Sequence, residues 1–243
     1  MAASRSGVVL AAGLGSRLRE RDDDVIKPLM PVGGVPMVFR ALRQLEQAGC
    51  DELVVVIGHR GAELRAAIAA AAPTVAPIVF VENPRYQLAN GVSLLSARPA
   101  LAPTFVVAMA DHLVGPSVMA LARAHVPDPD GATLLVDRRV TEVFDLDDAT
   151  KVESDGTRLR TIGKQIARYD CIDVGVFVCS HGLLDALQGV LDRRGDASLS
   201  EGVAALASTD KMAVLDIGDG FWQDVDTPEM LAHAERCIAA GLV

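Results

Sequence analysis

Short apolar runs alternate with helix-forming segments through the first half of the chain, and this alternation constrains the fold more than any other feature. The apolar runs are rich in Val and Ile and have the character of buried strands; they cover residues 7–10, 53–58, 77–81, 104–110 and 132–136. The helix-forming segments cover residues 62–72, 91–98 and 119–125. The alternation predicts an α/β fold with a doubly wound, mostly parallel sheet that carries helices on both faces.

The middle of the chain, residues 137–170, has a different character. It is polar and charged, and it contains short β-prone pieces at residues 141–144, 151–153 and 159–162. We interpret it as a small β-rich lobe attached to a single domain of residues 1–243. Beyond it we expect a strand at 172–179, two helical segments, a strand at 212–217 and a helix that begins at Pro228 with Thr227 as its N-cap.

The charge balance limits the partners that this chain can bind. Asp and Glu number 32 against 23 Lys and Arg, which gives a formal net charge of −9. No cluster of Lys or Arg forms a stripe, and this argues against nucleic acid as a partner. A protein this acidic would bind a polyanionic nucleotide locally, with a few cations and a divalent metal ion.

Cysteine usage and hydropathy favour a cytoplasmic protein without membrane insertion. The longest apolar stretch, residues 66–81, is interrupted by Pro73 and Pro77 and is shorter than the roughly 20 residues of a membrane span. Charged Arg5 directly precedes the first apolar run, which argues against a signal peptide. The cysteines lack metal-site spacing and are expected to be reduced thiols: Cys50, Cys171, Cys179 and Cys237.

The loop after the first apolar run carries the most informative motif. Leu10-Ala11-Ala12-Gly13 is followed by Gly15-Ser16-Arg17, and Lys27-Pro28 begins ten residues after Arg17. A strand that runs into a glycine-rich loop presents successive backbone N–H groups, and such a concavity binds anions. Arg17 and Lys27 would neutralise a polyphosphate held there. The motif therefore predicts nucleotidyl transfer.

Two common glycine-rich nucleotide motifs and a plain turn fit this loop less well. A dinucleotide-binding fingerprint requires Gly or Ala three residues after Gly15, where this chain has Leu18. The GxxxxGK[ST] phosphate loop is absent from the sequence. A tight turn without a ligand would account for Gly13 and Gly15, but it would leave Arg17 and Lys27 without a reason.

Three carboxylates are candidate Mg²⁺ ligands. Asp111 follows an apolar run, and ligands of open α/β sheets bind at the carboxyl ends of strands. Asp224 and Asp226 precede the last helix. Because Mg²⁺ is bound by one or two carboxylates plus phosphate oxygens, we expect Asp111 and Asp224 to hold it, with Asp226 nearer the helix N-terminus. Helix capping remains the alternative for Asp111, and which of Asp224 and Asp226 is the main ligand stays open.

These motifs resemble the sugar-phosphate nucleotidyltransferase family, and more narrowly its inositol-1-phosphate cytidylyltransferases. The segments that carry the narrower resemblance are spread over most of the chain: residues 109–112, 147–152, 162–164, 172–177, 198–203 and 221–229. The resemblance implies a Rossmann-like nucleotidyltransferase fold and an enzyme that uses CTP and Mg²⁺, acts on a phosphorylated alcohol, most naturally inositol 1-phosphate, and releases pyrophosphate.

The resemblance also implies roles for individual residues. Arg17, Lys27 and Lys164 would be catalytic, contacting the leaving pyrophosphate, the α-phosphate and the acceptor phosphate respectively. Mg²⁺ would be bound by Asp111, Asp224 and Asp226. Nucleotide binding would involve Leu10, Ala11, Ala12, Gly13, Gly15, Ser16, Asn83, Asn90, Gly91 and Asp111. Acceptor binding is assigned to polar residues of the small lobe or beside it: Asp137, Lys151, Asp173 and Glu201.

The sequence departs from the family in ways that keep alternatives open. Val174 stands where we expect Thr, and a phosphonate would satisfy the same motifs as a phosphate. Alternative acceptors are therefore a phosphonate or phosphocholine, or a sugar 1-phosphate with UTP or dTTP as the nucleotide. An alternative from a different class of function is an inactive nucleotide-binding regulatory module. Relatives that make inositol lipids often carry a second, membrane-embedded domain, so we expect the sequence as given to hold the transferase activity alone. An oligomer is possible.

Overall fold

The computed structural model describes residues 4–13 and 26–243 of the chain. Within these residues, nine strands form one sheet with the order β10-β9-β11-β6-β1-β4-β5, and β8 and β12 continue it beside β11. The strands are β1 (Arg5–Leu10), β4 (Glu52–Ile57), β5 (Ile78–Glu82), β6 (Thr104–Met109), β8 (Ala132–Asp137), β9 (Lys151–Ser154), β10 (Leu159–Gly163), β11 (Cys171–Ser180) and β12 (Met212–Asp216).

The sheet is mostly parallel, as the alternation predicted. Strands β5, β4, β1 and β6 are parallel neighbours. Strand β11 is antiparallel to β6, β8 and β9, so β8, β9 and the parallel partner β12 run in the same direction as β6. Among the described strands of this sheet, only β10 and β11 run the other way.

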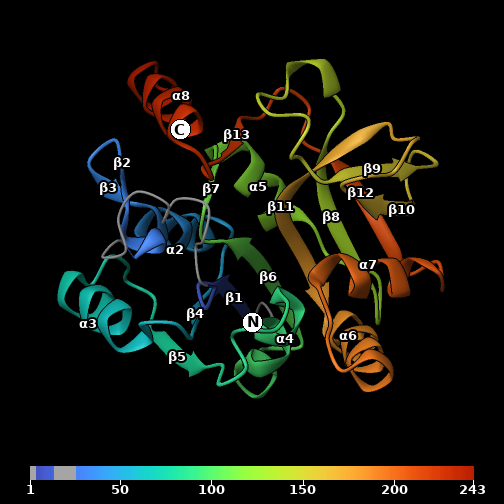
Figure 1. Ribbon diagram of the computed structural model, residues 1–243, viewed down its shortest axis with the longest axis horizontal. Helices are drawn as coiled ribbons and strands as arrows, with labels where there is room; N and C mark the ends of the chain where they lie inside the picture. Colours follow the sequence, from blue (N-terminus) through green and yellow to red (C-terminus); the bar gives the residue numbers. More distant parts are fainter. Residues whose placement is uncertain (1–3, 14–25) are drawn as a thin grey trace.

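Helices cover both faces of this sheet (Figure 1). Successive residues of a strand point to opposite faces: Val8 and Leu10 pack in the core that includes α4, α6 and α7, while Val9 packs with α2, α3 and α5. The helices are α2 (Met37–Gln47), α3 (Gly61–Ala71), α4 (Asn90–Ala97), α5 (Pro116–Ala124), α6 (His181–Arg194), α7 (Leu199–Ala207) and α8 (Pro228–Ala239), with short 3₁₀ turns η1 (Lys27–Leu29), η2 (Arg98–Ala100) and η3 (Val140–Glu142). None of the described helices has the length and apolar character that crossing a bilayer requires.

Two small ribbons position the segments around the end of β6. Strand β7 (His112–Val114) pairs with β13 (Trp222–Asp224), and β2 (Pro31–Val32) pairs with β3 (Val35–Pro36). Helix α8 packs on this region through Ala234, in a small core with Leu113 and Val225. Thr227 caps α8 and accepts a hydrogen bond from Met230 N at 3.2 Å, as the sequence predicted.

The small lobe is continuous with the main sheet. Its β9–β10 hairpin joins β11 where Cys171 pairs with Val152. The prediction of a β piece at residues 141–144 is wrong: the chain forms η3 there. The edges of β11 are occupied by β6, β8 and β9, and Phe144 instead stacks on His233 of α8 with a ring-centroid distance of 4.3 Å.

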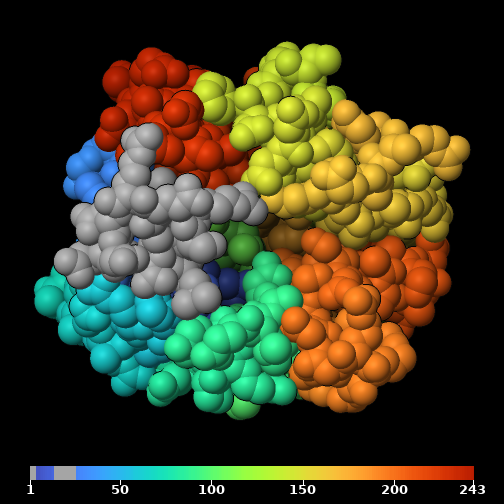
Figure 2. Space-filling view, viewed as in Figure 1, coloured from blue at the N-terminus to red at the C-terminus, as the bar shows by residue number. Residues whose placement is uncertain are grey.

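The face shown in Figure 2 is hollowed at its centre. The dark-blue end of the β1 segment and the green region around the end of β6 are visible in the hollow, which the orange helices α6 and α7 and the gold lobe border on one side. This is the edge to which the carboxyl ends of β1 and β6 point, and it is where an open α/β sheet binds its ligand.

Candidate active site

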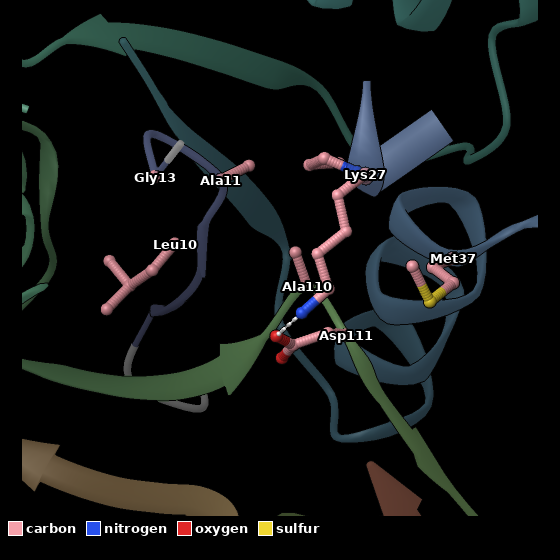
Figure 3. Close-up of a pocket in the computed structure, with 8 residues that line it drawn as sticks. Leu10, Ala11, Gly13, Lys27, Met37, Ala110 and Asp111 are labelled. Atoms are coloured by element: carbon pink, nitrogen blue, oxygen red, sulfur yellow. Dashed lines mark hydrogen bonds and ion pairs between the residues drawn. The ribbon is translucent and has the colours of Figure 1, made fainter. Parts of the chain in front are cut away.

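The ends of β1 and β6 place the first motif beside Asp111. The two strands pair in parallel, with Leu10 opposite Met109, so the residues that follow each strand leave the sheet together. A cavity of about 110 Å³ lies between these strand ends and η1 (Figure 3). We call it the nucleotide cavity, after the nucleotide-binding role that the sequence predicts for several of its residues. Its lining is Leu10, Ala11, Gly13, Lys27, Pro28, Met37, Ala110 and Asp111.

The nucleotide cavity thus brings together several residues that the sequence assigned to one site. Leu10, Ala11, Gly13, Lys27 and Asp111 all line it. Ala12 is buried in the hydrophobic core, with 2% of its surface exposed. The predicted residues Gly15, Ser16 and Arg17 lie outside the described residues, so their roles stay predictions.

Lys27 is the cation at the centre of the site. Its side chain extends from η1 toward the end of β6 (Figure 3), where Nζ donates to Asp111 Oδ2 at 2.6 Å. Nζ also forms an ion pair with Asp226. Burial alone would lower the pKa of Lys27, but the two carboxylates outweigh it and raise this pKa above its ordinary value. The ammonium group is therefore charged at any physiological pH.

Asp111 is held as a carboxylate between two donors. Its Oδ1 lies 3.0 Å from His112 Nδ1, and its Oδ2 accepts from Lys27. Burial would raise the pKa of Asp111, but the charge of Lys27 and the contact with His112 hold it well below its usual range. Burial also opposes protonation of His112, yet its carboxylate neighbours, Asp111 first and then Asp224 and Asp173, raise the pKa of the imidazole. Helix α5 begins after the N-cap Gly115, so Asp111 is not the cap of that helix.

The second acidic pair reaches this site through the β7–β13 ribbon. Asp224 pairs with His112 across the ribbon, and Val225 N donates to Asp111 O at 2.9 Å. Asp226 stands one residue before the helix cap Thr227, as expected, yet its carboxylate bonds to Lys27. Burial raises the pKa of Asp224 and the negative charges of Asp226 and Asp111 add to this rise, although His112 opposes it.

The carboxylates of Asp148, Asp224 and Asp226 form a group whose nearest oxygen atoms all lie within 4.8 Å of one another. Carboxylate oxygens are ligands that Mg²⁺ prefers, so this donor set fits the predicted metal. It contains the predicted ligands Asp224 and Asp226, but its third member is Asp148 rather than Asp111. Asp148 lies in one of the segments that carry the family resemblance, but the sequence pattern predicted no role for it. The contact between this lobe segment and the C-terminal segment arises only in the fold.

A second cavity, of about 260 Å³, begins at Asp111 and extends toward the small lobe. We call it the acceptor cavity. Its lining combines apolar and polar side chains: Asn90, Met109, Asp111, His112, Asp148, Ala149, Thr150, Lys164, Asp173, Gly175, Phe177, Leu199, Ser200, Trp222, Asp224 and Asp226. Lys164 Nζ lies 2.6 Å from Asp148 Oδ1 at its lobe side. Lys164 and Asp173, both predicted to contact the acceptor, therefore line one cavity.

Asp173 faces the acceptor cavity from an irregular part of β11. The register with β8 shifts between Asp173 and Phe177, and Gly175 adopts φ +78°, a conformation that favours glycine. Gly175 N donates to Asp173 Oδ1 at 2.7 Å; within the part of the chain that the structure describes, Oδ2 has no hydrogen-bond donor. Burial raises the pKa of Asp173 to about 6, with Gly175 N–H and His112 opposing the shift.

The other predicted acceptor residues do not line this cavity. Asp137, with 3% of its surface exposed, accepts from Trp222 Nε1 at 2.8 Å and from Arg139. Lys151 donates to three backbone carbonyls, among them Leu146 O at 2.7 Å. Glu201 forms a capping box with Ser198 at the start of α7. These contacts hold the scaffold around the cavity, and an acceptor-binding role for these three residues stays a prediction.

Three further residues predicted to bind the nucleotide, Asn83, Asn90 and Gly91, differ in their surroundings. Asn83 is fully buried, and its amide bonds to Ser93 Oγ at 3.0 Å and accepts from Arg85 N at 2.9 Å. Asn90 lines the acceptor cavity, and its Oδ1 accepts from Leu199 N at 2.8 Å. A Cβ at Gly91 would lie 2.6 Å from Ala197 O, so glycine permits the close approach of α4 to this segment.

Comparison with known proteins gives consistent matches along the chain. Residues 7–212 match the model of the MobA-like NTP transferase domain. The chain is 38% identical over 96% of its length to the bifunctional IPC transferase and DIPP synthase of Rubrobacter xylanophilus, and 29% identical over 95% to the protein of the same name from Aquifex aeolicus. It covers 52% and 51% of those two proteins, so it spans about half the length of these curated relatives.

A solved structure matches over nearly its whole length. The inositol-1-phosphate CTP transferase from T. maritima superposes with a TM-score of 0.82 at 28% identity, covering 99% of this chain and 98% of that chain.

Proposed function

The chain belongs to the MobA-like NTP transferase family, and from this premise we propose that it is a cytidylyltransferase that transfers CMP from CTP to inositol 1-phosphate, with release of pyrophosphate. The relatives from Rubrobacter and Aquifex carry a name that joins two activities, and this chain covers about half of each. The T. maritima CTP transferase matches this chain from end to end. The proposal is therefore limited to the transferase reaction.

One observation carries the proposal: Asp111 lines both the nucleotide cavity and the acceptor cavity. Lys27 lines the nucleotide cavity and Lys164 the acceptor cavity, so a cation is available on each side of Asp111. Two anionic substrates bound in the two cavities would meet at this carboxylate. Such an arrangement suits the joining of two phosphates.

The reaction requires little covalent chemistry from the protein. An oxygen of the acceptor phosphate attacks the α-phosphorus of CTP, the bond between that phosphorus and the bridging oxygen breaks, and pyrophosphate leaves with the bond electrons. The acceptor phosphate is ionised at neutral pH, so no general base is needed. Catalysis therefore rests on positioning and on stabilising the added charge.

Each charged residue has a place in this scheme. Lys27 would leave Asp111 and Asp226 to contact the α-phosphate, and Lys164 would leave Asp148 to hold the acceptor phosphate. Mg²⁺ bound by Asp111 with Asp224 or Asp226 would supply charge neutralisation at the phosphates. Arg17 is proposed to hold the leaving pyrophosphate.

We also propose that the protein is cytoplasmic. Its four cysteines, all buried and free of disulfides, support this proposal.

A pyrophosphate-release assay tests the proposal directly. CTP, UTP, dTTP and ATP are each paired with inositol 1-phosphate, glucose 1-phosphate, phosphocholine and 3-aminopropylphosphonate, in the presence of Mg²⁺. We expect CTP with inositol 1-phosphate to give the highest kcat/KM and a product with the mass of the CMP adduct. Faster turnover of glucose 1-phosphate with UTP or dTTP, or of CTP with either of the other two acceptors, would overturn the assigned substrates while leaving the family assignment intact.

The acceptor side can be tested separately with Lys164→Met. We expect KM for the acceptor to rise at least tenfold and KM for CTP to change less than twofold, because Lys164 lines the acceptor cavity but not the nucleotide cavity. Lys211→Met is the matched control: its Nζ lies 3.9 Å from Asp130 on the exposed surface, away from both cavities. Equal effects of Lys164→Met on both KM values would contradict the assigned role.

A further inference from the structure

A stacked pair of aromatic rings lines the acceptor cavity, and the proposed reaction does not require it; we call this pair the aromatic wall. Trp222 and His112 stand on the paired strands β13 and β7, with ring planes 15° apart and centroids separated by 6.2 Å. Both residues line the acceptor cavity, as do the apolar residues Met109 and Phe177. The nucleotide cavity contains neither ring among its lining residues. Trp222 also borders a third cavity together with Phe221 and Arg139, so among the cavities described the acceptor cavity is the one that both rings line.

Trp222 is fixed in place by partly buried polar contacts. Its Nε1 donates to Asp137 Oδ2 at 2.8 Å. Arg139 holds the same carboxylate with two nitrogen atoms, Nε at 3.0 Å from Oδ1 and Nη2 at 2.9 Å from Oδ2. Arg139 Nη2 also donates to Gly220 O at 2.6 Å, close to the ribbon strand that carries the indole. A side chain held in this way loses little conformational freedom when a ligand packs against it.

Polar groups with unused capacity stand around the same cavity. Asp173 Oδ2 has no donor among the described residues. Asn90 uses its Oδ1 to accept from Leu199 N, and no contact of its Nδ2 is found within the described part of the chain. A hydroxylated ring fits this combination, because its C–H face is apolar while its edge carries hydroxyl groups. A short linear alcohol has no comparable apolar face.

We infer that Trp222 determines acceptor specificity: the C–H face of a ring-shaped polyol phosphate packs on the indole while Asp173 accepts from its hydroxyl groups. This inference rests on the proposed function and states how its acceptor ring is recognised. It also gives Asp137 and Arg139 a positioning role: Asp137 accepts from the indole N–H, Arg139 holds that carboxylate, and neither residue lines the acceptor cavity.

The chain contains one tryptophan, so the intrinsic fluorescence of the wild-type protein reports this wall directly. The nucleotide-free protein is titrated with inositol 1-phosphate, glycerol 3-phosphate and inorganic phosphate. We expect a saturable change in Trp222 emission with inositol 1-phosphate, at concentrations at least tenfold below those at which either other compound has any effect. An equal response to glycerol 3-phosphate or to phosphate would overturn the inference. It would also be overturned if the emission did not change at concentrations of inositol 1-phosphate that support turnover once CTP is added.

Substitution separates the wall from its surroundings. Trp222→Leu removes the aromatic face and should raise KM for the acceptor about tenfold or more, the order expected when an aromatic contact and its buried area are lost. KM for CTP should stay within twofold. Phe221→Leu is the matched control, because Phe221 adjoins Trp222 in sequence and borders the third cavity with it, but does not line the acceptor cavity. Trp222→Phe retains a ring without the N–H donor, so it should give an intermediate rise and keeps the test valid if Trp222→Leu fails to fold.

The outcomes distinguish this inference from the proposed function. If the wild type transfers CMP to inositol 1-phosphate and Trp222→Leu behaves like Phe221→Leu, the inference fails and the function stands. If inositol 1-phosphate is not turned over but a different ring polyol phosphate is, and Trp222 emission and the Trp222→Leu effect follow that compound, the assigned acceptor fails and the role of Trp222 stands.

Discussion

Lys27 and Asp111 lie 84 positions apart in sequence, yet Lys27 Nζ is 2.6 Å from Asp111 Oδ2, at the edge where the nucleotide and acceptor cavities meet. The same ammonium group pairs with Asp226. Two carboxylates proposed as metal ligands thus share a protein cation. Metal and nucleotide binding must both rearrange this contact, because Mg²⁺ competes for the carboxylates and the α-phosphate competes for the lysine.

Lys27→Met should have opposite effects on turnover and on metal binding. Loss of one preorganised electrostatic contact lowers kcat by about 10²–10³-fold. Without nucleotide, however, the variant should bind Mn²⁺ at least tenfold more tightly than the wild type, since the metal no longer displaces an ammonium group. Electron paramagnetic resonance of free Mn²⁺ measures this affinity without any turnover.

The control for this experiment is Lys211→Met, which should match the wild type in both measurements. Mn²⁺ binding that is unchanged or weaker in folded Lys27→Met would show that Lys27 does not compete with the metal. Near-normal turnover in that variant would remove Lys27 from the catalytic assignment.

Substitution of the acidic group should identify its main metal ligand. Asp226 pairs with Lys27 and also belongs to the group with Asp148 and Asp224, so we expect Asp226→Asn to raise the Mg²⁺ concentration for half-maximal activity at least as much as Asp224→Asn. Both changes remove one negative charge and keep the side-chain volume. The measurement is a Mg²⁺ titration of initial rates at saturating CTP.

A matched carboxylate outside the group provides the reference. Asp185 is an exposed residue of α6 that pairs with Arg98. Asp185→Asn should leave the Mg²⁺ requirement unchanged. A severe effect of Asp224→Asn combined with a mild effect of Asp226→Asn would assign the metal to Asp224, as the sequence pattern favours.

The positions of Asp111 and Lys27 could be predicted because they depend on local patterns. An apolar run ending in Asp111 marks the end of a buried strand, and parallel strands end at the same sheet edge. The pairing of Lys27 with Asp226 could not be predicted in this way, because it joins residues 199 positions apart through the β7–β13 ribbon. Asp148 was missed for the same reason, since its neighbours Asp224 and Asp226 are distant in sequence.

The polar residues around the cavities show a second limit of sequence reasoning. Glu201 and Asn83 have the chemistry of ligand-binding residues, but the fold gives them local partners, the helix cap at Ser198 and the buried Ser93 hydroxyl. Buried polar groups almost always find such partners. Residue type alone therefore cannot separate Asp173, which keeps an oxygen atom available to the cavity, from polar residues that stabilise the scaffold.

The cysteines should be unreactive in the folded protein. Burial raises the pKa of the Cys50 and Cys171 thiols, each to about 12, and it raises the pKa of Cys179 as well. The thiolate is the reactive form, so at pH 8 these three thiols should react with Ellman's reagent more than 100-fold slower than in 6 M guanidinium chloride. Cys237, with 9% of its surface exposed on α8, should react first, and Cys237→Ser is the control that identifies it. Rapid reaction of two or more thiols in the native Cys237→Ser protein would contradict this burial.

Asp173 should make stability and acceptor binding depend on pH in opposite ways. Burial raises its pKa from 3.8 to about 6, so between these values the folded state binds a proton that the unfolded chain has already released. Stability therefore falls as pH rises from about 4 to 6 and stays reduced above that range.

Asp173→Asn removes this effect and keeps an oxygen atom for the Gly175 N–H, so its free energy of unfolding should exceed that of the wild type at pH 8 by up to about 3 kcal/mol. Urea denaturation at pH 4.5 and pH 8 measures the difference, which should fall to about a third of its value at the lower pH. The same variant should bind the acceptor more weakly at pH 8, because a carboxylate accepts hydroxyl hydrogen bonds more strongly than an amide. Asp185→Asn, at an exposed position, is the control and should show neither effect. A variant that is less stable than the wild type at pH 8 would contradict this prediction. It would show that the surroundings of Asp173 stabilise its ionised carboxylate.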